Sequence, residues 1–282
     1  MINGASVVLG VFGDPVEHSL SPVMHAHFAE STGADTVYVP FHVRPPGLNQ
    51  ALRALPALAI RGVNITVPHK EAAAPLMDSL APAARAIGAV NTVINRDGEL
   101  VGDNTDARGF LADLEAQFAG AAWKDRPALV LGAGGAARAV AFALGEAGLP
   151  AVTIANRTAA KAEALAAELL PATGRATDLA PDNLEAAVAE AGLIVNTTSM
   201  GLKGEAIPAL DLGHTHAGAV VYDLIYNPPE TPLIADARQR GMAAANGLGM
   251  LVRQGAISYE LWTGQGPPVA PVIEALKPAF DD

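Results

Sequence analysis

The sequence contains no cysteine, which excludes disulfides, thiolate catalysis and metal sites built on cysteine. Basic residues are also scarce, because 18 Lys and Arg stand against 29 Asp and Glu and leave a net charge of −11. Nucleic acids and anionic membranes need a basic face on their partner, so this charge balance argues against both. It leaves open a small anionic ligand, which needs only a local group of donors.

Long hydrophobic runs are missing as well. The most apolar region, residues 128–149, is interrupted by five glycines, Arg138 and Glu146, whereas a membrane-spanning helix needs about 20 mostly apolar residues. The first residues, MINGASVVLG, lack the basic segment and the long apolar core of a secretory signal. We therefore expect a cytoplasmic protein. No grouping of His, Asp and Glu has convincing metal-ligand spacing, so no metal is expected.

Short β-branched runs alternate with alanine-rich segments of helical period through most of the chain. This alternation predicts βαβ units, parallel sheets and the α/β fold class. The first series has expected strands at 7–12, 37–43, 60–66 and 89–95, and expected helices at 22–30, 47–55 and 68–76. The second series restarts at Pro127, with strands at 128–131, 151–155, 193–196 and 219–224, and helices at 136–146 and 159–170.

Two α/β domains follow from this restart. The first covers residues 1–106, and a helix beginning near Asp106 joins it to the second, residues 107–246. A long helix predicted at Leu248–Trp262 comes after the second series. We expect it to pack back on the first domain, so that residues 247–282 complete that domain.

The second domain carries a glycine-rich turn between its first strand and helix. The stretch GAGGAA, which includes Gly132, Gly134, Gly135 and Ala136, fits G-x-G-x-x-G/A. Such glycines allow a tight turn and let a pyrophosphate approach a helix N-terminus closely. A plain turn is the alternative, but the strand–turn–helix context and the second strand that follows favour a Rossmann-type dinucleotide site.

Charges after the second strand of this domain favour NADP over NAD. An NAD enzyme usually has Asp or Glu there to hold the ribose 2′-hydroxyl, but this chain has Asn156, Arg157 and Thr158, followed by Lys161. In the alternative interpretation, Thr158 caps a helix and the two cations are merely solvated. Two cations at a helix start with no acid suit a 2′-phosphate.

The first domain has a lysine at an unexpected place. In NITVPHK an apolar strand meets Pro68, which is favoured at the first position of a helix, so Lys70 should lie in that helix's first turn. The helix macrodipole disfavours a cation there. A role in function would explain why a lysine stands at this position.

Polar clusters stand at the ends of first-domain strands, within GDPVEHSLSP, GAVNT and GDNTD. Ligands of open α/β sheets bind outside the carboxyl ends of strands. Singly, each cluster has a structural explanation: Ser19 or Ser21 as a helix cap, Asn91 in a buried turn, and Asp106 or Thr105 as a cap. Together with Lys70 they make the parts of a site.

A glutamine in the last long helix belongs with them. Gln254 lies in an apolar stripe formed by Met250, Leu251, Ile257 and Leu261. A buried glutamine needs hydrogen-bond partners, and a structural partner and a ligand are equally good explanations from the residues alone.

Eight motifs occur in the order typical of shikimate dehydrogenases: GDPVEHSLSP, NITVPHK, GAVNT, GDNTDARGF, GAGGAAR, NRT, NTTSMGL and GLGMLVRQGAISYELWTG. The chain resembles that family over residues 13–264. The resemblance implies reversible NADP-dependent reduction of 3-dehydroshikimate to shikimate, in chorismate and aromatic amino-acid biosynthesis. It also implies a substrate domain and a Rossmann-type NADP domain, with the active site in the cleft between them.

The same resemblance implies roles for individual residues. Lys70 and Asp106 would be the catalytic pair. The substrate carboxylate would be held by Ser19, Ser21 and Tyr226, and the ring hydroxyls by Thr66, Lys70, Asn91, Asp106 and Gln254. The nicotinamide end of NADP would meet Thr198, Met200, Leu224, Gly247 and Met250. The family often has Asp where this chain has Asn246.

Several alternatives stay open at this stage. Lys70 either carries the proton or mainly stabilises charge on the substrate oxygen. Quinate/shikimate and aminoshikimate dehydrogenases are the nearest other activities, and a non-catalytic NADP-binding sensor is an alternative of another class. The sequence does not decide between a monomer and a homodimer.

Overall fold

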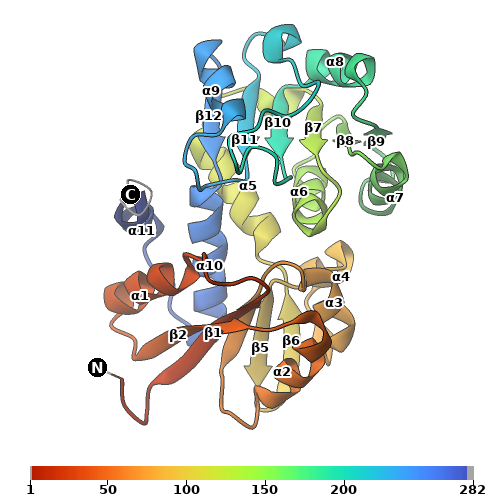
Figure 1. The fold of residues 1–282 in the computed structure, drawn as a ribbon. Coiled ribbons are helices and arrows are strands. Elements are labelled where there is room, and N and C mark those ends of the chain that lie inside the picture. The colour runs from red at the N-terminus through yellow and green to blue at the C-terminus, as the bar shows by residue number, and fades with distance from the viewer. Residues whose placement is uncertain (1, 278–282) are drawn as a thin grey trace. The chain divides into compact units, whose positions relative to one another are not determined.

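The computed structural model describes residues 2–277, which form two compact units (Figure 1). Among these residues, unit 1 consists of 2–109 and 252–277, and unit 2 of Phe110–Leu251. The chain passes between the units within two helices, α5 (Asp106–Gln117) and α10 (Leu248–Thr263). No helix of the described residues is long and apolar enough to cross a membrane.

Unit 1 is built on a six-stranded sheet in the order β2-β1-β3-β5-β6-β4. The strands are β1 (Val7–Gly13), β2 (Thr36–His42), β3 (Gly62–Ile65), β4 (Ser79–Leu80), β5 (Thr92–Arg96) and β6 (Glu99–Asp103). β5 runs antiparallel to both neighbours, and the other pairings are parallel. The sheet is therefore mainly parallel, as predicted. Asp97 and Gly98, both at positive φ, make the tight hairpin between β5 and β6.

Helices cover both faces of this sheet. An added Cβ at Gly62 would lie 2.1 Å from the Trp262 indole nitrogen of α10, whereas the next residue, Val63, belongs to the core of Leu48 and Leu52 on the other face. Unit 1 also contains α1 (Ser21–Thr32), η1 (Pro45–Gly47), α2 (Leu48–Ala54), α3 (Lys70–Ala73), η2 (Ala74–Leu76), α4 (Pro82–Ile87) and α11 (Val269–Leu276).

The helix predicted from Pro68 starts later than expected. Pro68 lies in a turn, closed by the His69 N–H donating to the Thr66 carbonyl oxygen at 2.9 Å. Lys70 is the first residue of α3, as predicted, but α3 is only Lys70–Ala73. So few aligned peptide units make a weak dipole. The predicted dipole penalty on Lys70 is therefore smaller than the sequence indicated.

Unit 2 has a parallel six-stranded sheet in the order β12-β11-β10-β7-β8-β9. With β7 counted as strand 1 and the sheet followed from β9 to β12, this is the order 3-2-1-4-5-6 of a Rossmann fold. The predicted fold class is therefore confirmed. The strands are β7 (Ala128–Leu131), β8 (Val152–Ala155), β9 (Gly174–Thr177), β10 (Leu193–Asn196), β11 (Val220–Asp223) and β12 (Ala243–Asn246). Its other elements are η3 (Trp123–Asp125), α6 (Gly135–Glu146), α7 (Ala159–Leu169), α8 (Pro181–Glu190), η4 (Leu212–His214) and α9 (Pro232–Gln239).

The buried face of α10 differs from the predicted apolar stripe. Leu251, Ile257 and Leu261 are only partly buried. The most buried large side chains are instead Tyr259 and Trp262, which are 0% and 3% exposed. The helix packs tightly where small residues permit it, since an added Cβ at Gly255 would lie 2.3 Å from the Met24 methyl of α1.

Candidate functional site

The reversed direction of β5 brings the polar clusters of unit 1 to one edge of its sheet. Asn64 near the end of β3, Thr92 at the start of β5 and Asp103 at the end of β6 lie side by side in the pairing register. Asn91, just before β5, therefore meets the loops that leave β3 and β6. Those loops lead to Lys70 and Asp106, the first residues of α3 and α5.

Lys70 and Asp106 form a short ion pair, with 2.6 Å between Nζ and Oδ2. The lysine side chain is 20% exposed and the aspartate side chain 6%. The other carboxylate oxygen, Oδ1, accepts from Asn91 Nδ2 at 2.8 Å. Asp106 is the first residue of α5 and so follows the N-cap position, and its N–H donates to Asn104 Oδ1 at 3.1 Å. Its carboxylate oxygens bind Lys70 and Asn91.

Asn91 is the centre of this group. Its Nδ2 also donates to Thr105 Oγ1 at 2.9 Å and to Gln254 Oε1 at 3.2 Å. Its Oδ1 accepts from the Thr105 N–H at 2.8 Å. Gln254 is 8% exposed, so the predicted core glutamine does have a protein partner. Hydrogen bonds therefore join Lys70 to Asp106, Asp106 to Asn91, and Asn91 to Gln254. The ammonium of Lys70, at one end of this group, is accessible and can stabilise or protonate an oxyanion.

The other predicted substrate residues of unit 1 have no hydrogen bond to this group among residues 2–277. Ser21 is the first residue of α1 and 9% exposed, and its N–H donates to Ser19 Oγ at 3.3 Å. Thr66 follows β3 directly. Tyr226, the remaining predicted substrate residue, belongs to unit 2, where burial raises the pKa of its phenol.

A buried network behind Asn91 escaped the sequence interpretation. Asn64 Nδ2 donates to the Asn91 carbonyl oxygen at 3.1 Å and to Ser258 Oγ at 3.1 Å, and Tyr38 Oη donates to Asn64 Oδ1 at 2.7 Å. Thr92 and Ser258 complete the network. The available signals were an asparagine inside a strand that is buried throughout, and a serine one helical turn after Gln254.

The predicted cofactor residues all lie where strands of the unit 2 sheet end. Gly132, Gly134, Gly135 and Ala136 follow β7, and Asn156, Arg157, Thr158 and Lys161 follow β8; Thr198 and Met200 follow β10, Leu224 follows β11, and Gly247 and Met250 follow β12. Because the sheet is parallel, these loops share its carboxyl edge. That edge is where nucleotides bind on this fold.

The glycine turn fits a dinucleotide phosphate group. Gly132 has φ +110°, and an added Cβ would lie 2.5 Å from Thr197 Oγ1. Gly134 caps α6, a helix of 12 residues, and an added Cβ there would meet nothing within 4 Å. The space beside Gly134, at the N-terminus of α6, is therefore open, which suits pyrophosphate.

The cations after β8 are exposed. Lys161 is the third residue of α7, so its predicted first-turn position is confirmed. Thr158 occupies the N-cap position but makes no capping hydrogen bond through its side chain to any described residue. Neither Arg157 nor Lys161 has an ion-pair partner within residues 2–277. Both charges remain available to an anion.

Asn196 shapes the loop after β10. Its Oδ1 accepts from the Thr198 N–H at 3.0 Å and from Thr198 Oγ1 at 2.7 Å, and its Nδ2 donates to Asp223 Oδ1 at 2.9 Å. Burial raises the pKa of Asp223, against the opposing donors Thr231, Ile225 and Asn196. The amide therefore ties the ends of β10 and β11 together.

Local structure explains the residue types at two positions near the start of α10. An added Cβ at Gly247 would lie 2.1 Å from the Leu224 carbonyl oxygen, so only glycine fits. Asn246 Nδ2 donates to the Pro229 carbonyl oxygen at 2.9 Å, and its Oδ1 accepts from the Leu248 N–H at 3.1 Å. An aspartate could not donate the first of these bonds.

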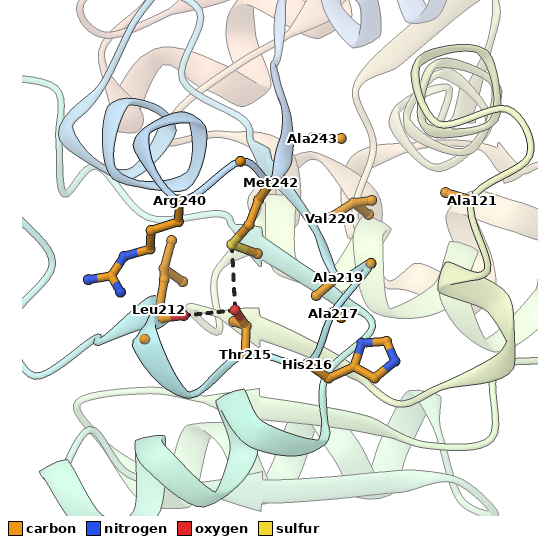
Figure 2. A pocket seen from close by; sticks show the side chains of 13 residues that line it. Ala121, Leu212, Thr215, His216, Ala217, Ala219, Val220, Arg240, Met242 and Ala243 are labelled. Atoms are coloured by element: carbon orange, nitrogen blue, oxygen red, sulfur yellow. Dashed lines mark hydrogen bonds between the residues drawn. The ribbon is translucent and has the colours of Figure 1, made fainter.

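A hollow of about 620 Å³ in unit 2 lies away from these residues (Figure 2). It is lined by Val220 and Ala243, which begin β11 and β12, and so lies at the amino edge of the sheet. Its Arg240 is already paired with Asp211 and Asp236. The described part of the chain also contains no group of three His, Asp or Glu side chains able to hold a metal ion.

Family models match three parts of the chain: the shikimate dehydrogenase substrate binding domain over residues 11–93, shikimate / quinate 5-dehydrogenase over residues 114–203, and the shikimate 5′-dehydrogenase C-terminal domain over residues 247–277. The shikimate dehydrogenase (NADP(+)) of Methylobacterium radiotolerans is 52% identical over 267 residues, covering 93% of each chain.

Solved structures agree with these matches. Shikimate 5-dehydrogenase from Thermus thermophilus in complex with NADP(H) and shikimate is 43% identical, with a TM-score of 0.88 over 97% of this chain and 99% of that one. Quinate dehydrogenase from Corynebacterium glutamicum in complex with NAD is 32% identical, with a TM-score of 0.88 over 96% and 98%. The chain belongs to the shikimate dehydrogenase family.

Proposed function

We propose that this chain is an NADP-dependent shikimate dehydrogenase, which reversibly reduces 3-dehydroshikimate to shikimate. The observation that carries the proposal is the Lys70–Asp106 ion pair, held by Asn91 at the carboxyl edge of the unit 1 sheet. Relatives covering nearly the whole chain carry that activity in their names. A cytoplasmic location, the usual setting of NADP-dependent biosynthesis, belongs to the same proposal.

Lys70 handles the charge on the substrate oxygen. NADPH supplies the hydride when it is bound. In the reduction, negative charge grows on the ketone oxygen, and the Lys70 ammonium stabilises it and provides the proton. A positioned acid of this kind contributes typically ~10² to 10⁴-fold. Asp106 keeps the ammonium in place through its 2.6 Å contact.

The remaining residues of unit 1 hold the substrate in this proposal. Ser19 and Ser21, with Tyr226 of unit 2, take the carboxylate. Thr66, Asn91, Asp106 and Gln254 take the ring hydroxyls. The support is chemical, since hydroxyl and phenol groups donate to a carboxylate, whereas amide and carboxylate groups form hydrogen bonds with alcohols.

NADP belongs to unit 2 in this proposal. Gly132, Gly134, Gly135 and Ala136 cradle the pyrophosphate at the start of α6. Arg157 and Lys161, with the backbone of Asn156 and Thr158, take the 2′-phosphate. Thr198, Met200, Leu224, Gly247 and Met250 line the nicotinamide end. We assign residues 107–246 to the cofactor domain and residues 1–106 with 247–282 to the substrate domain. Gly247 and Met250, which line the nicotinamide end in this proposal, belong to unit 2.

The test is an initial-rate assay of shikimate and of quinate, each with NADP and with NAD, followed by the absorbance of the reduced cofactor. We expect fast turnover with shikimate and NADP only. Comparable rates with quinate or NAD would assign the chain to a broader quinate/shikimate activity. Binding of NADP without any turnover would mean a non-catalytic sensor. Lys70→Ala, purified in parallel, controls for a contaminating host enzyme.

A further inference from the structure

The side-chain amide of Asn91 has a defined orientation of its oxygen and its nitrogen. Asn91 Oδ1 accepts from the Thr105 N–H at 2.8 Å, a group that can only donate, and from Thr92 Oγ1 at 2.9 Å. Around Nδ2 lie acceptors, including Asp106 Oδ1 at 2.8 Å and Gln254 Oε1 at 3.2 Å. Turning the amide over would place its oxygen against the Asp106 carboxylate.

Thr92 contributes to that orientation through its hydroxyl proton. Its side chain is fully buried, and a neighbouring hydroxyl, Ser258 Oγ, lies 2.7 Å from Thr92 Oγ1. Ser258 in turn accepts from Asn64 Nδ2 at 3.1 Å. The Ser258 hydroxyl donates to the Gln254 carbonyl oxygen at 3.0 Å. Thr92 Oγ1 accepts from Asn64 Nδ2 at 3.3 Å and donates its proton to Asn91 Oδ1 at 2.9 Å.

We propose that Thr92 is a positioning residue for the reaction, which helps to fix the orientation of the Asn91 amide so that its N–H groups face Asp106 and the substrate. Thr92 has no hydrogen bond to Lys70 or Asp106 within residues 2–277, and it acts through Asn91. The inference rests on the proposed function, because it concerns the rate at which shikimate is oxidised.

Thr92→Val tests it, since valine suits a buried strand and removes only the hydroxyl. One buried hydrogen bond is lost at Asn91 Oδ1, so we expect kcat/KM for shikimate to fall about 10-fold. The loss should lie mainly in kcat, with KM for NADP unchanged. Thr92→Ser keeps the hydroxyl and should stay within about 2-fold of the wild type.

Thr36→Val is the matched control. Its hydroxyl also contacts a buried hydroxyl, Tyr259 Oη at 3.4 Å, but not this network, and its kinetics should equal those of the wild type.

The outcomes are distinguishable. If the wild type does not oxidise shikimate, the proposed function fails and this inference falls with it. If the wild type is active and Thr92→Val matches it, only the inference is overturned. Equal losses in Thr92→Val and Thr92→Ser would assign the effect to packing of the threonine methyl group, which also overturns it.

Discussion

His25 is expected to make the stability of unit 1 depend on pH. It lies on α1, is 2% exposed, and stacks on the Tyr38 ring with 3.9 Å between centroids and 6° between planes. The Asn64 side chain approaches it, yet both ring nitrogens are buried without a hydrogen-bond partner among the described residues. Burial lowers the pKa of His25 to about 3, only partly offset by Asn64.

The sign and size follow from linkage. The ordinary histidine pKa of 6.5 applies to the unfolded chain, which therefore binds a proton below pH 6.5 that the folded chain refuses until about pH 3. The free energy of unfolding consequently falls as pH decreases through this window. Each unit below 6.5 costs about 1.4 kcal/mol, so the loss at pH 5 is about 2 kcal/mol.

His25→Leu removes the titrating ring. Trp262 packs against His25 at 5.8 Å between centroids, and Trp123→Phe leaves it the only tryptophan of the chain. Urea unfolding of that background, followed by Trp262 fluorescence at pH 8 and pH 5, reports on unit 1. Between the two pH values, the unfolding free energy should fall about 2 kcal/mol more in the protein that retains His25 than in the His25→Leu variant.

His27→Leu controls for a leucine placed on the same helix. The comparison uses only the change with pH, so a different stability of the variants at pH 8 does not enter it. Parallel pH dependence with and without the His25 ring would refute the reasoning, because a ring that stays neutral when folded must show this difference.

Three further predictions concern the proposed reaction. Lys70→Ala should lower kcat by ~10² or more with a smaller change in KM for shikimate, and a near-normal kcat in steady-state assays would reject its role. Arg157→Ala should raise KM for NADP about 10-fold, through loss of a charge-assisted contact, while leaving KM for NAD nearly unchanged; equal effects would count against a 2′-phosphate site. Gly132→Ala should weaken NADPH binding more than about 10-fold in a fluorescence titration, because the residue has φ +110° and its Cβ would lie 2.5 Å from Thr197 Oγ1. An unchanged Kd would show that the turn tolerates a side chain.

Sequence patterns correctly predicted the strands and helices that are specified by their own residues and immediate neighbours. The strand at 128–131 was predicted with the bounds of β7, and α6 begins one residue before the predicted 136. Both are marked by a continuous apolar run followed by glycines and an alanine-rich helical repeat. By contrast, β9 and β12 read GRAT and AAAN, which have no apolar alternation. They become strands only because neighbouring strands offer edges to pair with.

The sequence by itself determined which chemical groups the chain contains. These are Lys70 shortly after an apolar strand, Asp106 at the start of a helix, and a glycine turn at Gly132 between a strand and a helix. The tertiary structure decided how Asn91 is held. That depends on β5 running against its neighbours, and on α10 returning to place Gln254 Oε1 3.2 Å from Asn91 Nδ2 although the two residues are 163 positions apart. The periodicity of apolar residues in the sequence carries information only about residues a few positions apart. Hydrogen-bond partners this distant are selected by the order of the strands and the packing of helices on them.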